Sequence, residues 1–396
     1  LEDIAYVASG STPDKTCFVE NGVPYIKMYN LRNQKIDFAY HPQYITEEVH
    51  NGKLQRSRTE VGDLIMNIVG PPLGKLAIIP TTLPQANFNQ AAVLIRPYKF
   101  KEVLVSYLKV YLEEMSEINS IATRGSAGQV NISLTQSQNM RIPIPPLNEV
   151  RRIIEEVSKY DILIDSLKQN ITDIQNLIAY TKSKILDLAI HGKLVPQDPN
   201  DEPAIELLKR INPDFTPCDN GHYPVGWIET ILGELFSHNT GKALNSSNKE
   251  GIFKDYLTTS NVYWNKFDFT AIKQMPFKES ELNKCTVTKG DLLVCEGGDI
   301  GRSAIWNYDY DICIQNHIHR LRPKIDLCVP FYYYTFAYLK ENNLIGGKGI
   351  GLLGLSSNAL HKIEMPLPPL AEQQRIVQKI EELFSVLDNI QNALEV

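Results

Sequence analysis

A long stretch near the middle of the chain carries apolar residues at spacings that alternate between four and three. The pattern continues unbroken over about five heptads, which is typical of a coiled-coil seam. An ordinary amphipathic helix on a globular core, the alternative, predicts a shorter run with a period of 3.6. The seam positions are Ile153, Val157, Tyr160, Ile164, Leu167, Ile171, Ile174, Ile178, Thr181, Ile185 and Leu188.

A second, shorter run at the end of the chain has the same register. Both runs follow a Pro-Pro-Leu sequence, and Glu149 or Glu372 stands in the first turn, which are signals for a helix start. We expect the two helices to pack as an antiparallel coiled coil, with the second helix truncated. The apolar positions of the second run are Ile376, Ile380, Leu383, Leu387, Ile390 and Leu394.

The chain also repeats itself once over most of its length. Short sequences recur in the same order in both halves, and collinear matches of this kind indicate a duplicated domain. The stretches between them differ strongly, as expected for one scaffold with different loops. The repeated Asp63 and Asp291 follow a glycine and precede apolar residues, so we interpret them as turns into buried strands rather than as metal ligands. The matched pairs are residues 25–31 and 256–262, 61–65 and 289–293, 74–75 and 301–302, 95–97 and 321–323, and 142–147 and 365–370.

Length and composition allow several classes of protein and disfavour others. The 396 residues suffice for two or three domains, and a hydrophobic fraction of 43% gives them cores. A formal net charge of −6 argues against DNA binding unless Lys and Arg gather on one face or a basic partner contributes. No apolar run is long enough to span a membrane, and the first residues lack the features of a signal peptide. Because the chain opens on Leu1, we expect a trimmed natural N-terminus.

The cysteines and two motif-like sequences give no support to catalysis or metal binding. The 6 cysteines are scattered without a C-x-x-C pair, which predicts reduced thiols, and Cys285, Cys295, Cys313 and His317 lack the spacing of a zinc site. The segment 70–76 is one residue too short between its glycines for a phosphate-binding loop. The segment 212–215 departs from the Asn-Pro-Pro-aromatic loop of adenine methyltransferases, and no cofactor loop precedes it. We interpret these two segments as a turn between strands and a helix terminator.

The junctions between the duplicated domains and the helices resemble the type I restriction–modification DNA specificity subunit family. Residues 366–377, PLPPLAEQQRIV, are similar to the family's proline-to-helix junction almost residue for residue. Residues 142–154 are a looser copy, with Asn148-Glu149-Val150-Arg151 where glutamine is usual. Residues 191–194 and 224–227 also resemble family landmarks, and the resemblance covers nearly the whole chain.

The resemblance implies a mixed α/β (α+β) fold with two target-recognition domains, each reading half of a bipartite site in double-stranded DNA. The helices would set the gap between the half-sites and dock two methyltransferase (modification) subunits, and restriction–translocase subunits would complete the complex. The chain itself would be non-catalytic and without a cofactor or metal, because S-adenosylmethionine, ATP and Mg belong to the partner subunits. It would lie in the cytoplasm of a bacterium or archaeon. The expected divisions are the first target-recognition domain 1–147, spacer helix 148–192, a linker with a short helix 193–221, the second target-recognition domain 222–370, and spacer helix 371–396.

Base reading needs Arg, Lys, amide or hydroxyl side chains on exposed loops. In the first domain we predict DNA contacts from Lys27, Tyr29, Asn30, Arg32, Lys75, Asn89, Gln90 and Arg124. In the second domain we predict them from Thr259, Asn261, Lys266, Arg302, Asn316, His317 and Lys348. Two other functions stay open, a DNA adenine methyltransferase, which would need a cofactor pocket, and a coiled-coil scaffold protein.

Overall fold

A computed structural model describes residues 1–396 except 71, 125–129, 217–222, 245–249, 346–354 and 396. It divides the chain into a first unit, residues 1–168, and a second unit, residues 169–396. Among the described residues, no helix is long and apolar enough to cross a membrane.

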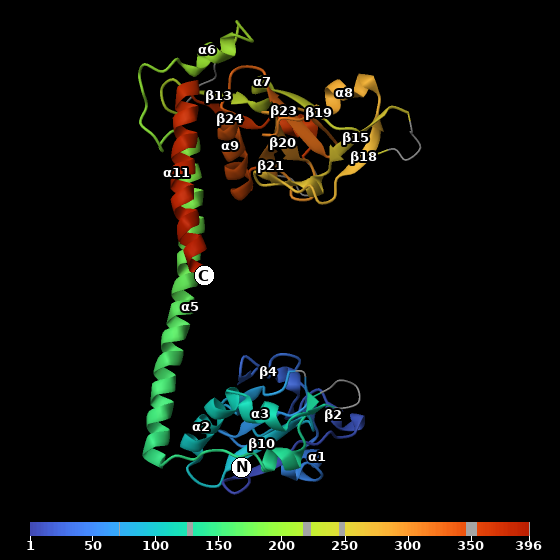
Figure 1. The fold of residues 1–396 in the computed structure, drawn as a ribbon, viewed down its shortest axis with the longest axis vertical. Coiled ribbons are helices and arrows are strands. Elements are labelled where there is room, and N and C mark those ends of the chain that lie inside the picture. The colour runs from blue at the N-terminus through green and yellow to red at the C-terminus, as the bar shows by residue number, and fades with distance from the viewer. Residues whose placement is uncertain (71, 125–129, 217–222, 245–249, 346–354, 396) are drawn as a thin grey trace. The chain divides into compact units, whose positions relative to one another are not determined.

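The first unit is built on a four-stranded antiparallel sheet (Figure 1). Apolar side chains cover both of its faces. One face, with Leu64 and Ile95, packs against helix α2, Lys101–Glu113, and the other, with Ile65 and Leu94, packs against a second sheet. Strands covered on both faces are apolar throughout, as these are. The first sheet has the order β1 (Ala5–Ser9), β10 (Ala92–Pro97), β7 (Leu64–Asn67), β8 (Leu76–Ile78), and the second β2 (Phe18–Val19), β6 (Tyr44–Ile45), β3 (Val23–Ile26), β9 (Asn87–Phe88).

The second unit repeats this architecture, which confirms the predicted duplication of a mixed helix and strand fold. Its main antiparallel sheet has the order β14 (Phe236–Thr240), β23 (Ile318–Pro323), β20 (Leu292–Cys295), β21 (Ser303–Ile305). Its second sheet has the order β18 (Lys273–Phe277), β15 (Ile252–Leu257), β22 (Ile312–Ile314), β19 (Thr286–Val287). Both second sheets contain one parallel pair, β3 with β9 and β15 with β22.

Smaller elements complete each unit. The first unit has hairpin β4 (Leu31–Arg32) and β5 (Lys35–Ile36), the pair β11 (Thr123–Arg124) and β12 (Val130–Asn131), and helices α1 (Glu47–Asn51), α3 (Ser116–Ile121) and α4 (Leu134–Gln138). The second unit has hairpin β16 (Val262–Tyr263) and β17 (Lys266–Phe267), the pair β13 (Ile228–Ile231) and β24 (Glu364–Leu367), and helices α6 (Ala204–Lys209), α7 (Leu232–Leu235), α8 (Glu279–Cys285), α9 (Val329–Glu341) and α10 (Ser357–His361).

The repeated Gly-Asp turns are structural, as predicted. Asp63 is fully buried, accepts a hydrogen bond from the Glu60 amide at 2.6 Å, and binds the Arg96 guanidinium through both carboxylate oxygens at 2.9 and 2.6 Å. Asp291 repeats this with Arg322, at 2.7 Å to each oxygen. Each arginine belongs to the repeated Arg-Pro sequence. Within each unit, the repeated Gly-Asp sequence therefore contacts the repeated Arg-Pro sequence.

The two long helices contact each other over part of their length. Helix α5 runs over Leu147–Ile190 and α11 over Leu370–Leu394. The last two turns of α5 share a core with Ile376, Val377 and Ile380, and Lys182 pairs with Asp388 further along α11, which makes the contact antiparallel (Figure 1). Each fully buried side chain of this kind contributes roughly 1.5–3 kcal/mol.

Only the C-terminal part of the predicted α5 seam is buried against other residues in the structure. Ile178 and Ile185 are buried, whereas the earlier part of the seam is half-buried at Ile153 and Val157 and exposed from Tyr160 to Ile174. The reason is length, because α5 has 44 residues and α11 has 25. On α11, Ile376 and Ile380 are buried, Leu383 and Leu387 are half-buried, and Ile390 is exposed. The exposed seam positions are Tyr160, Ile164, Leu167, Ile171 and Ile174.

The junction before α11 shows why its sequence contains glutamate and glutamine. Gln373 is fully buried, accepts from the Cys328 amide at 2.9 Å and donates to the Pro368 carbonyl at 2.9 Å. Glu372 is buried too and accepts from the Trp227 indole at 2.9 Å and from Gln197 at 2.7 Å. At the looser first junction, the position of Gln373 holds Val150, which is buried without polar groups to satisfy. The departure noted in the sequence therefore exchanges a hydrogen-bonded contact for an apolar one.

Two histidines occupy the main sheet of the second unit where the first unit has valines. By strand register, His238 and His319 take the places of Val7 and Val93. His238 Nε2 lies 2.7 Å from His319 Nδ1, and His319 Nε2 lies 2.8 Å from the Leu355 carbonyl oxygen. Because a carbonyl only accepts, we assign the hydrogen of His319 to Nε2 and make its Nδ1 the acceptor from His238, an arrangement that needs the His319 ring neutral.

Acidification is expected to destabilise the second unit through this pair. Burial, together with the neighbouring His319 and His361, lowers the pKa of His238 from 6.5 to about 4, and burial also lowers the pKa of His319. The unfolded chain therefore binds more protons between pH 6.5 and about 4, so stability falls as the pH drops through that window. We expect His238 to account for a loss of about 1–2 kcal/mol in the free energy of unfolding, allowing for its partial exposure. Measuring unfolding at pH 7 and pH 5 tests this. A His238→Val/His319→Val variant that loses as much stability between these pH values as the unchanged chain would contradict it.

Candidate nucleic-acid interface

In the first unit, the predicted contact residues gather where the parallel strand pair ends. The Asn89 amide donates to the Ile26 carbonyl at 3.1 Å, which sets Asn89 and Gln90 beside Lys27. The next residues form a 3-10 turn, Met28–Asn30, and hairpin β4–β5. Gln34 at the hairpin tip accepts from the Leu76 amide at 2.7 Å, so Lys75 lies next to the tip. We call this surface the hairpin face of the first unit.

The second unit builds a hairpin face from the same parts. The Gln315 amide donates to the Leu257 carbonyl at 2.9 Å, so Asn316 and His317 follow the end of the parallel pair. A 3-10 turn, Thr259–Asn261, leads into hairpin β16–β17, whose tip donates from the Asn265 amide to the Ser303 carbonyl at 3.1 Å. Arg302, the neighbour of Ser303, donates to the Thr259 carbonyl. The hairpin faces are thus equivalent surfaces with different side chains.

Cations on both faces lie over tyrosine rings. The Arg32 guanidinium is 4.0 Å from the centroid of the Tyr40 ring and 3.8 Å from Asp37. In the second unit, Arg302 is 5.0 Å and Lys266 is 6.0 Å from the centroid of Tyr263. Such contacts orient a cation while leaving its outer hydrogen-bond donors available. Arg32 and Lys266 are exposed.

Asn30 and Asn261 hold the 3-10 turns rather than project from them. Asn30 is fully buried, accepts from the Lys27 amide at 2.9 Å, and donates to the carbonyls of Asp37 and Tyr40 at 3.1 and 2.7 Å. Asn261 makes the matching bonds and is 2% exposed. The predicted equivalence of the two residues is confirmed. Their amides are already used by the backbone, so we no longer expect either side chain to contact a base.

The side chains of the other predicted contact residues differ in their solvent exposure. Gln90 and His317 are exposed, and His317 lies 3.6 Å from Glu296. Arg302 is half-buried because it is turned inward to the Thr259 carbonyl, which corrects the exposed position that we expected from its turn. The remaining half-buried positions are Lys27, Tyr29, Lys75, Asn89, Thr259 and Asn316.

Two of these half-buried residues have notable polar atoms. The Tyr29 hydroxyl donates to the His41 carbonyl at 3.2 Å, and burial raises its pKa. The Asn89 side-chain oxygen is buried without a hydrogen-bond partner in the described structure. Two predictions fall elsewhere, since Lys348 and the side chain of Arg124 lie outside the described residues.

The structure also adds residues that we did not predict, Lys35, Tyr40 and Tyr263. Lys35 holds the same hairpin position as the predicted Lys266, opposite Arg32 and Tyr263 in their two-stranded pairs, and both lysines are exposed. The alignment of the two copies could have revealed Lys35. Tyr40 and Tyr263 lie beneath cations because each hairpin folds back over its ring. No short sequence pattern predicts this contact.

The described residues contain no group of three or more His, Cys, Asp or Glu able to hold a metal ion. The segment resembling a phosphate-binding loop leads into strand β8 rather than a helix, and Gly74 has a φ of +75°, so it is a turn as predicted. Asn212 follows α6 and donates its amide to the Leu208 carbonyl at 2.9 Å, which confirms a helix terminator.

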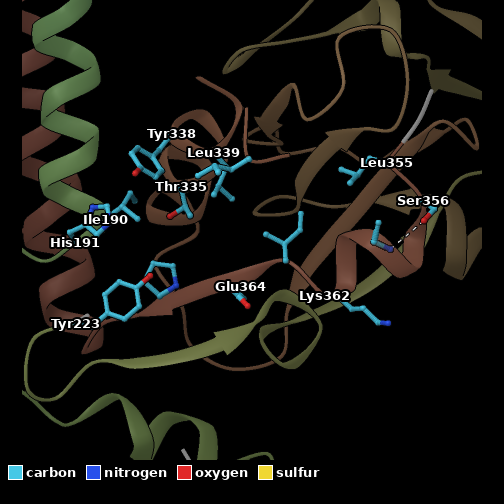
Figure 2. Close-up of a pocket in the computed structure, with 14 residues that line it drawn as sticks. Ile190, His191, Tyr223, Thr335, Tyr338, Leu339, Leu355, Ser356, Lys362 and Glu364 are labelled. Atoms are coloured by element: carbon cyan, nitrogen blue, oxygen red, sulfur yellow. Dashed lines mark hydrogen bonds between the residues drawn. The ribbon is translucent and has the colours of Figure 1, made fainter. Parts of the chain in front are cut away.

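A cavity of about 480 Å³ lies at the end of α5, between α9, α10 and β24 (Figure 2). His191 and Tyr223 lie together at one end, with ring centroids 6.5 Å apart, and Leu355 and Ser356 lie at the other. Ile190, Leu339 and Ile363 make much of the lining apolar.

Comparison with known proteins identifies the family. The family model of the type I restriction modification DNA specificity domain matches residues 1–176 and again residues 224–396. The chain therefore belongs to this family, and the resemblance of its junction sequences is confirmed.

Individual relatives agree. The chain is 25% identical over 289 residues to the specificity subunit of the type I restriction enzyme EcoBI from Escherichia coli, covering 70% of this chain and 58% of that protein. It is 23% identical over 383 residues to the EcoKI specificity subunit from Escherichia coli K12, covering 93% and 77%. The fold is similar to that of the HsdS subunit from Thermoanaerobacter tengcongensis, with a TM-score of 0.60, 18% identity, and coverage of 99% of this chain and 90% of that one. The chain thus spans 58% of the length of the EcoBI relative.

Proposed function

We propose that this chain is a non-catalytic DNA specificity subunit of a type I restriction–modification complex. Each unit would read one half of a bipartite duplex through its hairpin face. The observation that carries the proposal is the duplication of that face, with the same turn, hairpin and exposed lysine in both units. A shared frame with unlike side chains suits two readers of two different sequences.

The partners and chemistry follow from this role. The exposed part of the α5 seam, from Tyr160 to Ile174, is an apolar stripe suited to helices of methyltransferase subunits. Those subunits would bind S-adenosylmethionine and methylate adenine, and restriction–translocase subunits would use ATP and Mg. Such a complex would work in the cytoplasm of a bacterium or archaeon.

The test is half-site recognition by the chain together with its methyltransferase subunits. The duplex is designed from the methylated adenines mapped in the host genome, and each half is scrambled in turn. We expect His317→Ala to weaken discrimination of one half-site only and Gln90→Ala that of the other, each by about 1–3 kcal/mol, because both side chains are exposed on the hairpin faces. A chain that retains every duplex equally, with or without the intact halves, would overturn the proposal.

The same preparation separates the two alternative functions. Tight binding of S-adenosylmethionine by the isolated chain would point to a methyltransferase. Binding of partner subunits without any site-specific DNA retention would point to a scaffold protein.

A further inference from the structure

A notch of about 460 Å³ lies in the second unit between α9, α11 and the tip of hairpin β16–β17. Three aromatic rings, Tyr333, Tyr334 and Phe384, and two carboxylates, Glu381 and Asp388, line it beside Asn265 of the hairpin tip. We call it the acidic aromatic notch. It is distinct from the hairpin face but shares its hairpin, since Asn265 precedes Lys266 in the chain.

The three rings pack edge to face against one another and form a corner. The Tyr333 and Tyr334 centroids are 5.1 Å apart with an interplanar angle of 65°, and those of Tyr334 and Phe384 are 6.0 Å apart at 86°. Trp264 of the hairpin packs edge-on against Tyr333 at 6.1 Å and joins the hairpin to this corner. Ring faces carry the negative part of the aromatic quadrupole, so a corner of this kind attracts cations.

The carboxylates make the notch negative. Asp388 pairs with Lys182, whereas Glu381 is exposed and takes part in no ion pair among the described residues. Burial, with the charges of Glu381 and Asp388 adding to it, raises the pKa of the Tyr334 hydroxyl. Because these carboxylates oppose ionisation of the hydroxyl, the electrostatic potential at the ring corner is negative.

The chain itself shows how this wall binds a cation. The Lys182 ammonium lies 5.6 Å from the centroid of the Phe384 ring and pairs with Asp388. The repeat does not require the aromatic corner, because the position of Tyr334 in α9 is held by Ser106 in the matching helix α2. The notch is therefore an addition to the shared scaffold rather than part of it.

We propose that the acidic aromatic notch receives an arginine or lysine side chain of the methyltransferase subunit. The identity of the partner rests on the function proposed above, and the chemistry of its side chain rests on the rings and carboxylates. A cation held there sits next to the hairpin that carries Lys266, which couples docking of the subunit to the hairpin face of the second unit.

The experiment compares two glutamates that are neighbours in α11. Glu381→Gln removes a charge from the notch, and Glu382→Gln removes the same charge from a residue that pairs with Lys379 and does not line the notch. Binding of the methyltransferase subunit to each full chain is measured by titration at several salt concentrations. We expect Glu381→Gln to weaken binding by roughly fivefold to thirtyfold and to flatten its salt dependence, with no change for Glu382→Gln.

Tyr334→Leu keeps the charge but removes a ring, and is expected to weaken binding while leaving the salt dependence unchanged. Equal effects of the two glutamate variants, or no effect of either, would overturn the notch proposal while leaving the proposed function in place. Failure of the unchanged chain to bind the subunit would overturn both, and site-specific DNA retention then reports on the function separately.

Discussion

Replacing Asp291 with alanine is expected to cost the second unit about 2–3 kcal/mol of its free energy of unfolding. The carboxylate is 1% exposed and accepts two hydrogen bonds from Arg322 and one from the Thr288 amide at 2.8 Å. Its removal leaves the Thr288 amide without its acceptor and takes two charge-assisted hydrogen bonds from the guanidinium, which keeps its bond to the Thr288 hydroxyl and its contact with solvent. Asp63→Ala should act in the same way on the first unit, where Lys101 also loses its partner at 2.7 Å.

Hydrogen exchange resolves which unit is affected, since two units need not unfold together. Amides of β20 and β23 should lose protection in Asp291→Ala while those of β7 and β10 keep theirs, and Asp63→Ala should give the reverse. Asp309→Ala is the control, because Asp309 is 86% exposed and its pair with Lys289 is worth about 1 kcal/mol or less. A loss in Asp291→Ala no larger than in this control would show that the repeated turn does not depend on its carboxylate.

On the proposed function, the DNA affinity of a complex of the chain with methyltransferase subunits is expected to fall about 10³- to 10⁵-fold between 50 and 200 mM salt. This range corresponds to roughly six to ten neutralised phosphates. The chain has a net charge of −6, so this neutralisation has to come from local cations such as Lys35 and Lys266 and from the partner subunits. The slope of affinity against salt concentration, both on logarithmic scales, measures how many phosphates are neutralised.

Lysine variants show how much of that slope comes from the hairpin faces. Lys35→Ala/Lys266→Ala should reduce it by about two, because each phosphate that is no longer neutralised lowers the slope by close to one. Lys209→Ala is the matched control, because Lys209 is an exposed lysine on α6 that pairs with Glu206 at 3.1 Å. Salt-independent affinity would contradict electrostatic docking through the hairpin faces, and an unchanged slope in the double variant would remove the two lysines from the interface.

Several features of the fold could be read from local sequence patterns. The collinear matches predicted two copies of one architecture, and both main sheets have the same strand order. The Pro-Pro-Leu signals predicted helix starts at 148 and 371, one residue after the observed starts at Leu147 and Leu370. Gly192 stands two residues beyond the end of α5 with a φ of +64°, a conformation that glycine adopts without strain. These features depend on backbone preferences and on spacing within a few residues, which a sequence displays directly.

Burial at the candidate site could not be read in the same way. Asn30 and Arg32 are both polar and two residues apart, yet one is fully buried and the other is exposed over Tyr40. The difference arises because the hairpin folds back and brings the carbonyls of Asp37 and Tyr40 onto the Asn30 amide. A polar residue type predicts a need for hydrogen bonds but not whether the backbone, water or a nucleic acid will meet that need.

By itself, the sequence determined the duplication, the two helical spacers and the Gly-Asp turns, because each of these is encoded in the order and spacing of neighbouring residues. Tertiary structure alone decided how much of the α5 seam is covered, that Arg96 and Arg322 serve the turn aspartates, and that Tyr334 and Glu381 meet in a notch. These contacts join segments far apart in the chain. Their geometry depends on how whole elements pack, which no local pattern records.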